Sequence, residues 1–210
     1  MEQAPDIVTV RRHALLDIAR RHQRPGSGSQ PWRKDERLRL NWPNLANILS
    51  GTPWAIVGAV ATRRYMPERA TGDLDIAVLP RDVDGVAERL AAAGYKRRGA
   101  LAIGGSSWEA PGGVTVDVIE GRDDWWPEAL AAANQNLDAD GAPVLPLPYL
   151  VLMKVLAGRL QDLADVARML GYATDESLDE VRRVVAAFAP VLRDDLESII
   201  VQGRLETGQA

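Results

Sequence analysis

Two aspartates separated by one leucine, Asp73 and Asp75, are the residues of this chain best suited to chemistry. They belong to the run Asp-Leu-Asp-Ile-Ala-Val, which is typical of a strand entering a core, so the two side chains point to the same face. Their Cα atoms would then lie roughly 6.6 Å apart. Two carboxylates at this spacing repel unless a cation or a proton offsets the repulsion. The pair predicts a site for a hard divalent ion such as Mg²⁺, which also binds phosphate oxygens and water.

A short apolar strand and a glycine turn precede the two aspartates. The residues Trp54–Val57 predict the strand, Gly58 and Ala59 form the turn, and a segment with helical character follows at 60–65. A strand, a glycine turn and a helix start leave backbone N–H groups free to face an anion. Thirteen residues separate Ala59 from Asp73.

This arrangement resembles the nucleotidyltransferase superfamily, which has a polymerase-β-like fold. Its signature is a hydrophobic strand, Gly-Gly or Gly-Ser, a spacer of about this length, and Asp-x-Asp or Asp-x-Glu. The closer resemblance is to the branch that contains minimal nucleotidyltransferases and AbiEii-type toxins. The positions that match the motif of this branch are Ala61, Tyr65, Arg69, Thr71, Asp73, Leu74 and Asp75.

A second block, at 150–170, resembles the helical segment that follows the catalytic sheet in the same branch. Its matching positions are Lys154, Arg159, Asp162 and Asp165. The resemblance covers roughly residues 46–170. The chain departs from the family at Ala59, where Gly or Ser is usual, so a hydroxyl that would contact the triphosphate is missing.

The resemblance implies a Mg²⁺-dependent nucleotidyltransferase that moves NMP from an NTP such as ATP to an acceptor. The acceptor would be an RNA such as tRNA, a cognate protein partner or a small molecule, and the protein would serve a toxin–antitoxin or defence system. A different class of function stays open, namely a non-catalytic nucleotidyltransferase-like protein that binds or regulates. Ala59 favours this alternative, whereas burying three carboxylates without a metal is costly and opposes it.

Asp73, Asp75 and Asp117 are the catalytic and metal-binding residues that the resemblance implies, with two Mg²⁺ ions roughly 3.5–4 Å apart when NTP is bound. Asp117 lies in an apolar strand-like run, so its side chain faces away from the side chains of its neighbours. In the family a third aspartate on a neighbouring strand joins the metal site and can deprotonate the attacking hydroxyl. The alternative for Asp117 is a strand residue that faces solvent.

Five residues are predicted to contact the nucleotide. They are Gly58, Ala59, Arg69, Thr71 and Lys154. Arginine offers a fork for phosphate oxygens and lysine a point charge, although each of these cations can equally be a surface charge or pair with an aspartate. Thr71 is expected to orient the aspartate loop through a local hydrogen bond.

Several other groups have two interpretations. Asp162 and Asp165 are expected to pair with Arg159 or Arg168. The pair Trp125 and Trp126 either stacks on a base or has a buried or interface role. Residues 11–39 carry nine Arg/Lys against three Asp/Glu. This basic segment either binds RNA, forms a solvated face or docks on an acidic partner.

The composition favours a cytoplasmic globular protein. Apolar residues make up 46% of the chain, and no run of eighteen apolar residues predicts a membrane span. The N-terminus lacks the apolar segment of a secretory signal. The absence of cysteine excludes disulfides and thiolate metal sites, and two histidines make a histidine-rich zinc site an unfavourable interpretation.

The predicted fold class is α+β, a small mixed sheet packed with helices and followed by a helical C-terminal region. We predict three parts: a basic N-terminal helix and linker at 1–40, a nucleotidyltransferase-like core at 41–147 and a helical region at 148–210. Strands are expected at 54–57, 73–79, 95–103, 107–109, 113–119 and 144–147. Helices are expected at 5–24, 43–50, 82–93, 125–133, 150–170 with a break at Gly158, 176–189 and 191–203.

Overall fold

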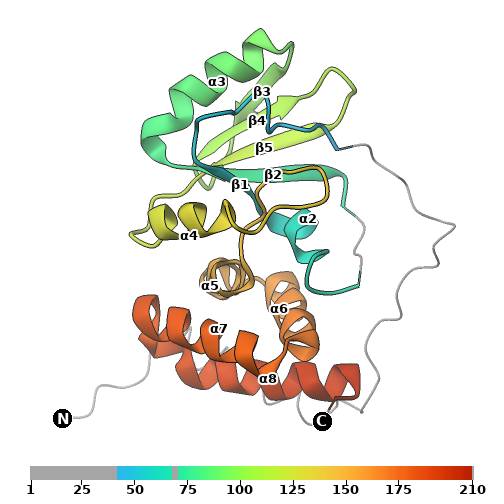
Figure 1. Ribbon diagram of the computed structural model, residues 1–210, viewed down its shortest axis with the longest axis vertical. Helices are drawn as coiled ribbons and strands as arrows, with labels where there is room; N and C mark the ends of the chain where they lie inside the picture. The colour runs from blue at the N-terminus through green and yellow to red at the C-terminus, as the bar shows by residue number, and fades with distance from the viewer. Residues whose placement is uncertain (1–41, 68–70, 210) are drawn as a thin grey trace, which may run out of the picture. The chain divides into compact units, whose positions relative to one another are not determined.

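The computed structural model describes residues 42–67 and 71–209 (Figure 1). The described chain divides between Pro146 and Leu147 into two compact units, which we call the sheet unit and the helical unit. The predicted N-terminal helix and linker lie outside the described residues. Within the described ranges, no helix is both long and apolar enough to span a membrane.

The sheet unit is built on one five-stranded mixed sheet in the order β1-β2-β5-β4-β3. Its strands are β1 (Trp54–Ile56), β2 (Asp73–Val78), β3 (Lys96–Ala100), β4 (Gly105–Glu109) and β5 (Thr115–Glu120). The central pair, β2 and β5, is parallel, and the other three pairings are antiparallel. Five of the six predicted strands are therefore confirmed, and the sheet with its helices confirms the predicted α+β class.

Alternating burial explains why the central strands form. Leu74 and Ile76 on β2 and Val116 and Val118 on β5 are almost fully buried, whereas the aspartates between them are half-buried. Successive side chains of a strand point to opposite faces, so one face of the sheet enters the core. The other face carries Asp73 and Asp75 of β2 and Thr115 and Asp117 of β5.

Short helices connect the strands of the sheet unit. They are α2 (Gly58–Thr62), the 3₁₀ turn η1 (Pro80–Asp82), α3 (Val83–Ala92) and α4 (Trp126–Ala133). In α3, Val86 and Leu90 are buried one turn apart, as the predicted amphipathic pattern requires. The predicted helices at 82–93 and 125–133 are thus confirmed.

Two predicted elements of the sheet unit are wrong. Residues 46–50 form turns instead of a helix: the Leu49 N–H makes one helical hydrogen bond to the Leu45 carbonyl oxygen, and Gly51, with a φ of 78°, then ends the turn. Residues 144–147 do not form an edge strand, since Val144 makes only an isolated bridge to Ile56. Leu147 already belongs to the following helix.

The helical unit contains four helices and a 3₁₀ turn. These are α5 (Leu147–Ala157), α6 (Leu160–Tyr172), α7 (Asp175–Phe188), η2 (Pro190–Leu192) and α8 (Arg193–Thr207). The predicted break at Gly158 is confirmed, because this residue has a φ of 64° between α5 and α6. Helix α7 begins after Thr174, whose side chain accepts the Ser177 N–H as an N-cap.

Helices α6 and α8 pack through two glycines. A Cβ atom at Gly203 would lie 1.9 Å from the carbonyl oxygen of Ala167, and one at Gly171 would lie 2.4 Å from that of Gly203. The Thr207 hydroxyl adds hydrogen bonds to the carbonyl oxygens of Gly171 (3.2 Å) and Gly203 (3.0 Å). The two backbones therefore approach closely where no side chain intervenes.

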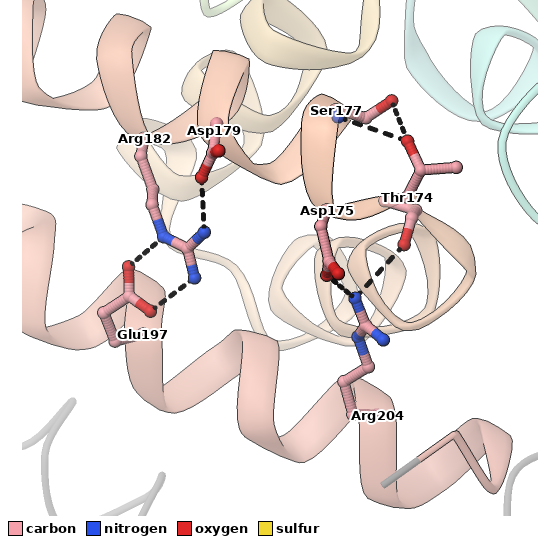
Figure 2. Close-up of polar contacts among 8 residues, drawn as sticks. Thr174, Asp175, Ser177, Asp179, Arg182, Glu197 and Arg204 are labelled. Carbon is pink, nitrogen blue, oxygen red and sulfur yellow. Dashed lines mark hydrogen bonds and ion pairs between the residues drawn. The ribbon is translucent and has the colours of Figure 1, made fainter.

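Arginines join the surfaces of α7 and α8 (Figure 2). Arg182 on α7 donates two hydrogen bonds to the Glu197 carboxylate on α8, at 2.7 and 3.0 Å. Arg204 on α8 donates to Asp175 at the start of α7, at 2.7 Å. Such exposed pairs fix the alignment of helices and add little stability, typically about 0–1 kcal/mol each.

Candidate active site

Three aspartates converge on the polar face of the sheet. Strands β2 and β5 are in parallel register with Asp75 directly beside Asp117, and Asp73 precedes Asp75 by two residues on the same face. One carboxylate oxygen from each residue lies within 4.8 Å of one from each of the others. The predicted convergence is confirmed, whereas the catalytic and metal-binding roles of the three remain predictions.

The donor set fits a divalent cation. All three residues are half-buried, and Asp117 Oδ1 is buried without a hydrogen-bond partner among the described residues. An ionised carboxylate oxygen only accepts, so a buried one without a donor is costly unless a cation binds it. Three carboxylates and no softer ligand suit Mg²⁺ better than zinc.

Gly58 places the start of α2 directly against this cluster. Its φ is 63°, and a Cβ atom there would lie 1.9 Å from Asp75 Oδ2. The N–H of the preceding Val57 donates to the Asp75 carbonyl oxygen at 2.9 Å and joins the turn to β2. The sequence predicts phosphate binding at Gly58 but does not predict this contact, because only the folded register reveals which carboxylate faces the turn.

The loop before β2 holds Asp73 in place. The Thr71 hydroxyl donates to Asp73 Oδ1 at 2.5 Å, which is the local hydrogen bond predicted for this residue. Arg69 lies outside the described residues, and its predicted contact with phosphate stays a prediction. The same holds for the nucleotide contacts of Gly58, Ala59 and Thr71.

Tyr65, another motif position, has a structural contact within the sheet unit. Its hydroxyl donates to the Leu145 carbonyl oxygen at 3.2 Å and accepts a hydrogen bond from the Asn136 amide at 2.8 Å. The same amide also donates to the Val144 carbonyl oxygen at 2.8 Å. This network fixes the chain after α2 to the segment that follows α4.

Lys154, predicted to contact the triphosphate, is engaged within the helical unit. Its side chain is 3% exposed, and its Nζ lies 3.0 Å from Asp162 Oδ1 and 2.9 Å from Asp165 Oδ2. Its charge is thus balanced by two buried carboxylates, which corresponds to the ion-pair alternative of the sequence analysis. Arg168 lies within ion-pair distance of Glu206, with its Nε 3.5 Å from Glu206 Oε1.

Arg159 completes this cluster by donating to Asp162 Oδ2 at 2.5 Å, as predicted. Burial by itself would raise the pKa of Asp162. The hydrogen bonds from Arg159 and Lys154 and the attraction of their charges more than offset burial and hold this pKa below its ordinary value. Asp162 is therefore a carboxylate whose ionised form the fold stabilises.

The tryptophan pair is part of the core of the sheet unit. Trp125 and Trp126 are 3% and 4% exposed, and their rings stack on each other with centroids 4.1 Å apart. Gly121 leaves space for the Trp126 ring, since a Cβ there would lie 2.5 Å from it. The buried interpretation is therefore confirmed, and stacking on a base is excluded for this conformation.

Comparisons with known proteins give distant structural likenesses only. No protein family and no curated protein matches the sequence. The solution structure of the antibiotic-resistance factor ANT(2'')-Ia is 15% identical, with a TM-score of 0.39 over 73% of this chain and 82% of that chain. The crystal structure of ANT(2'')-Ia in complex with adenylyl-2''-tobramycin is 14% identical, with a TM-score of 0.40 over 73% and 87%.

A third solved structure is terminal uridylyl transferase 4 from Trypanosoma brucei with bound GTP. It is 13% identical, with a TM-score of 0.32 over 88% of this chain and 73% of that chain. None of these names singles out the AbiEii-type branch, which stays a prediction.

Proposed function

We propose that this protein is a Mg²⁺-dependent nucleotidyltransferase that transfers NMP from an NTP to a hydroxyl group of an acceptor. The observation that carries the proposal is the convergence of Asp73, Asp75 and Asp117, with one buried oxygen of Asp117 lacking a donor among the described residues. The sequence motif around Gly58 and Asp73 supports the same reaction. The triad and Gly58 occupy one compact unit, so the site does not depend on how the two units are placed.

The residues present suit each part of the reaction. Asp73 and Asp75, braced by Thr71 and Gly58, would hold the divalent ions. When bound, these ions would neutralise phosphate charge and lower the pKa of the attacking hydroxyl. The Asp117 carboxylate, which would also bind one of these ions through Oδ1, would take the proton of that hydroxyl. A bond then forms between the acceptor oxygen and the α-phosphorus, the bond from that phosphorus to the bridging oxygen breaks, and pyrophosphate leaves with the electron pair.

A double variant, Asp73→Asn with Asp75→Asn, tests the assignment. We expect it to abolish Mg²⁺-dependent NTP binding in titration calorimetry and to leave the fold intact or more stable, because removing like charges relieves repulsion. The matched control is Asp84→Asn with Glu88→Gln, which removes the same formal charge from exposed positions of α3. Unchanged Mg²⁺·NTP affinity in the double variant would refute the metal site.

The non-catalytic alternative makes a different prediction. A binding or regulatory protein would bind Mg²⁺·NTP through the same aspartates, yet it would transfer no labelled nucleotide to RNA, protein or an aminoglycoside. The AbiEii-type affiliation, the toxin–antitoxin or defence role and the cytoplasmic location rest on the sequence analysis. The phosphate contact of Lys154 is not part of this proposal, because its ammonium is held by Asp162 and Asp165.

A further inference from the structure

A row of small residues leads away from the aspartates across the polar face of the sheet. Asp117 is in register with Ser107 on β4, and Ser107 is in register with Gly99 on β3. Neighbouring strands lie about 4.8 Å apart, so this row extends roughly 10 Å from Asp117 to the sheet edge. We call the surface over Ser107 and Gly99 the lane.

The lane is open at its outer end. A Cβ atom added to Gly99 would meet nothing within 4 Å, and Ser107 is only half-buried. The neighbouring Ser106 points to the other face, where its hydroxyl accepts the indole N–H of the buried Trp108. Ser107 therefore presents a hydroxyl beside Asp117, on the same face of the sheet.

A β-bulge creates this opening. The register of β3 against β4 shifts between Arg97 and Gly99, so Gly99 takes the place opposite Ser107 that Arg98 would have in a regular strand. Arg98 instead forms an ion pair with Glu109, which lies on the same face as Ser107. Bulges re-aim side chains in this way beside functional sites.

Two cations border the outer end of the lane. Lys96 is in register with Glu109, and Arg98, 58% exposed, contacts the same carboxylate. At the sheet edge, Lys96, Arg98 and the Glu109 carboxylate leave a net charge of +1, whereas the inner end of the same row carries Asp73. Arg97 is in register with the buried Trp108 and belongs to the opposite face.

We propose that the lane holds the acceptor and that the acceptor is the end of a single-stranded RNA. Its terminal hydroxyl would lie at Asp117, the Ser107 hydroxyl would position the terminal sugar, and Lys96 and Arg98 would contact a backbone phosphate. This inference rests on the proposed function, since it assigns the acceptor side of the same site. A polycationic acceptor would meet repulsion at the sheet edge, whereas a phosphodiester chain complements it.

Charge on an edge strand also prevents pairing with other chains, and this explanation applies equally to Lys96, Arg97 and Arg98. Binding of RNA phosphate beside the lane would involve Lys96 and Arg98 but not Arg97, because Arg97 lies on the opposite face of the sheet. The test is the affinity of the full chain for a short single-stranded RNA with a 5′ fluorescein, measured by anisotropy at several salt concentrations. The variants are Lys96→Gln with Arg98→Gln, and Arg97→Gln as the matched control on the other face.

We expect the double variant to bind this RNA about tenfold more weakly. The slope of log affinity against log salt concentration should become less negative by about 0.7 for each lost phosphate contact. Arg97→Gln should retain the affinity and slope of the unaltered protein. Equal effects of both variants, or none from the double variant, would overturn the proposal. Wild-type protein that binds no RNA would overturn it as well.

A second variant tests the lane sterically. Gly99→Val fills open space without a clash, so the fold should persist, and transfer of labelled NMP to the same RNA should fall about tenfold while Mg²⁺·ATP affinity is unchanged. Gly85→Val, at an open position of α3, is the control. If Gly99→Val transfers labelled NMP to the RNA as fast as the unaltered protein does, the lane is refuted. If the unaltered protein does not bind Mg²⁺·ATP, the proposed function is refuted instead.

Discussion

Gly58 and Asp75 lie so close together that a Cβ atom at position 58 would fall 1.9 Å from Asp75 Oδ2. The same glycine has a φ of 63°, a conformation that costs other residues roughly 1–2 kcal/mol. One residue therefore satisfies two demands, one from its own backbone and one from a carboxylate of the proposed metal site.

The first prediction separates these two demands. Gly58→Ala should lower the free energy of unfolding by more than the roughly 1–2 kcal/mol of backbone strain, because Asp75 must also move. Gly51→Ala is the matched control, since Gly51 has a φ of 78° and an added Cβ there meets nothing within 4 Å. Urea denaturation gives the free energy of unfolding of both variants. Equal losses of this free energy would show that moving Asp75 costs no stability.

The second prediction concerns the buried ion pairs of the helical unit. Lys154→Met leaves the carboxylates of Asp162 and Asp165 without their ammonium partner, and breaking a buried pair in this way typically costs about 3–5 kcal/mol. Chemical denaturation measures the loss. The triple variant with Asp162→Asn and Asp165→Asn should recover most of it, and a loss similar to that of Lys96→Met on the exposed β3 edge would contradict the ion-pair role.

The third prediction follows from the lowered pKa of Asp162. A carboxyl whose folded-state pKa lies below its unfolded value of about 3.9 binds its proton more weakly when folded. Its stabilisation is complete above the unfolded pKa and disappears as the pH falls through the folded pKa. The difference in unfolding free energy between the unaltered protein and Asp162→Asn should therefore be constant from neutral pH to about 5 and shrink below about 4. A difference in unfolding free energy that grows as the pH falls would contradict the lowered pKa of Asp162.

The fourth prediction addresses the contact between α6 and α8. Gly203→Ala places a Cβ 1.9 Å from the Ala167 carbonyl oxygen, so the helices must separate, at a cost of typically about 1–3 kcal/mol. Gly85→Ala in α3 meets open space and should instead gain roughly 0.5–1 kcal/mol from helix propensity. Thermal melts of the two variants should shift in opposite directions, and a shift in the same direction would show that α8 adjusts freely.

Local patterns in the sequence were sufficient to predict most of the elements that carry the candidate site. Asp-Leu-Asp in an apolar run predicts two carboxylates on one face of a strand, and the same alternation around Asp117 predicts the third. Gly158 marks the break between α5 and α6 because glycine both weakens a helix and accepts a positive φ. These inferences succeed because each depends on residues a few positions apart.

The contacts that the sequence did not reveal all depend on tertiary structure. The register that places Asp75 beside Asp117, and Ser107 beside Asp117, follows from strand pairing over long separations. Lys154 has the residue type of a phosphate ligand, and only the packing of α6 against α5 shows that two aspartates bind it. The wrong helix prediction at 43–50 has a local cause instead, because Gly51 adopts a positive φ and ends the turn after one helical hydrogen bond.

The parallel pairing of β2 with β5 has a consequence for how the protein is made. Parallel strands cannot be joined by a tight turn, and here η1, α3, β3 and β4 all come between the two in the chain. A nascent chain or a degradation fragment that ends before Thr115 contains Asp73, Asp75 and the flanking strand β1, but it lacks β5 on the other side and with it the third carboxylate. Such partial products should have no nucleotidyltransferase activity. Any nucleotide transfer would begin only after β5 has left the ribosome and has paired with β2, a long-range step that is slow.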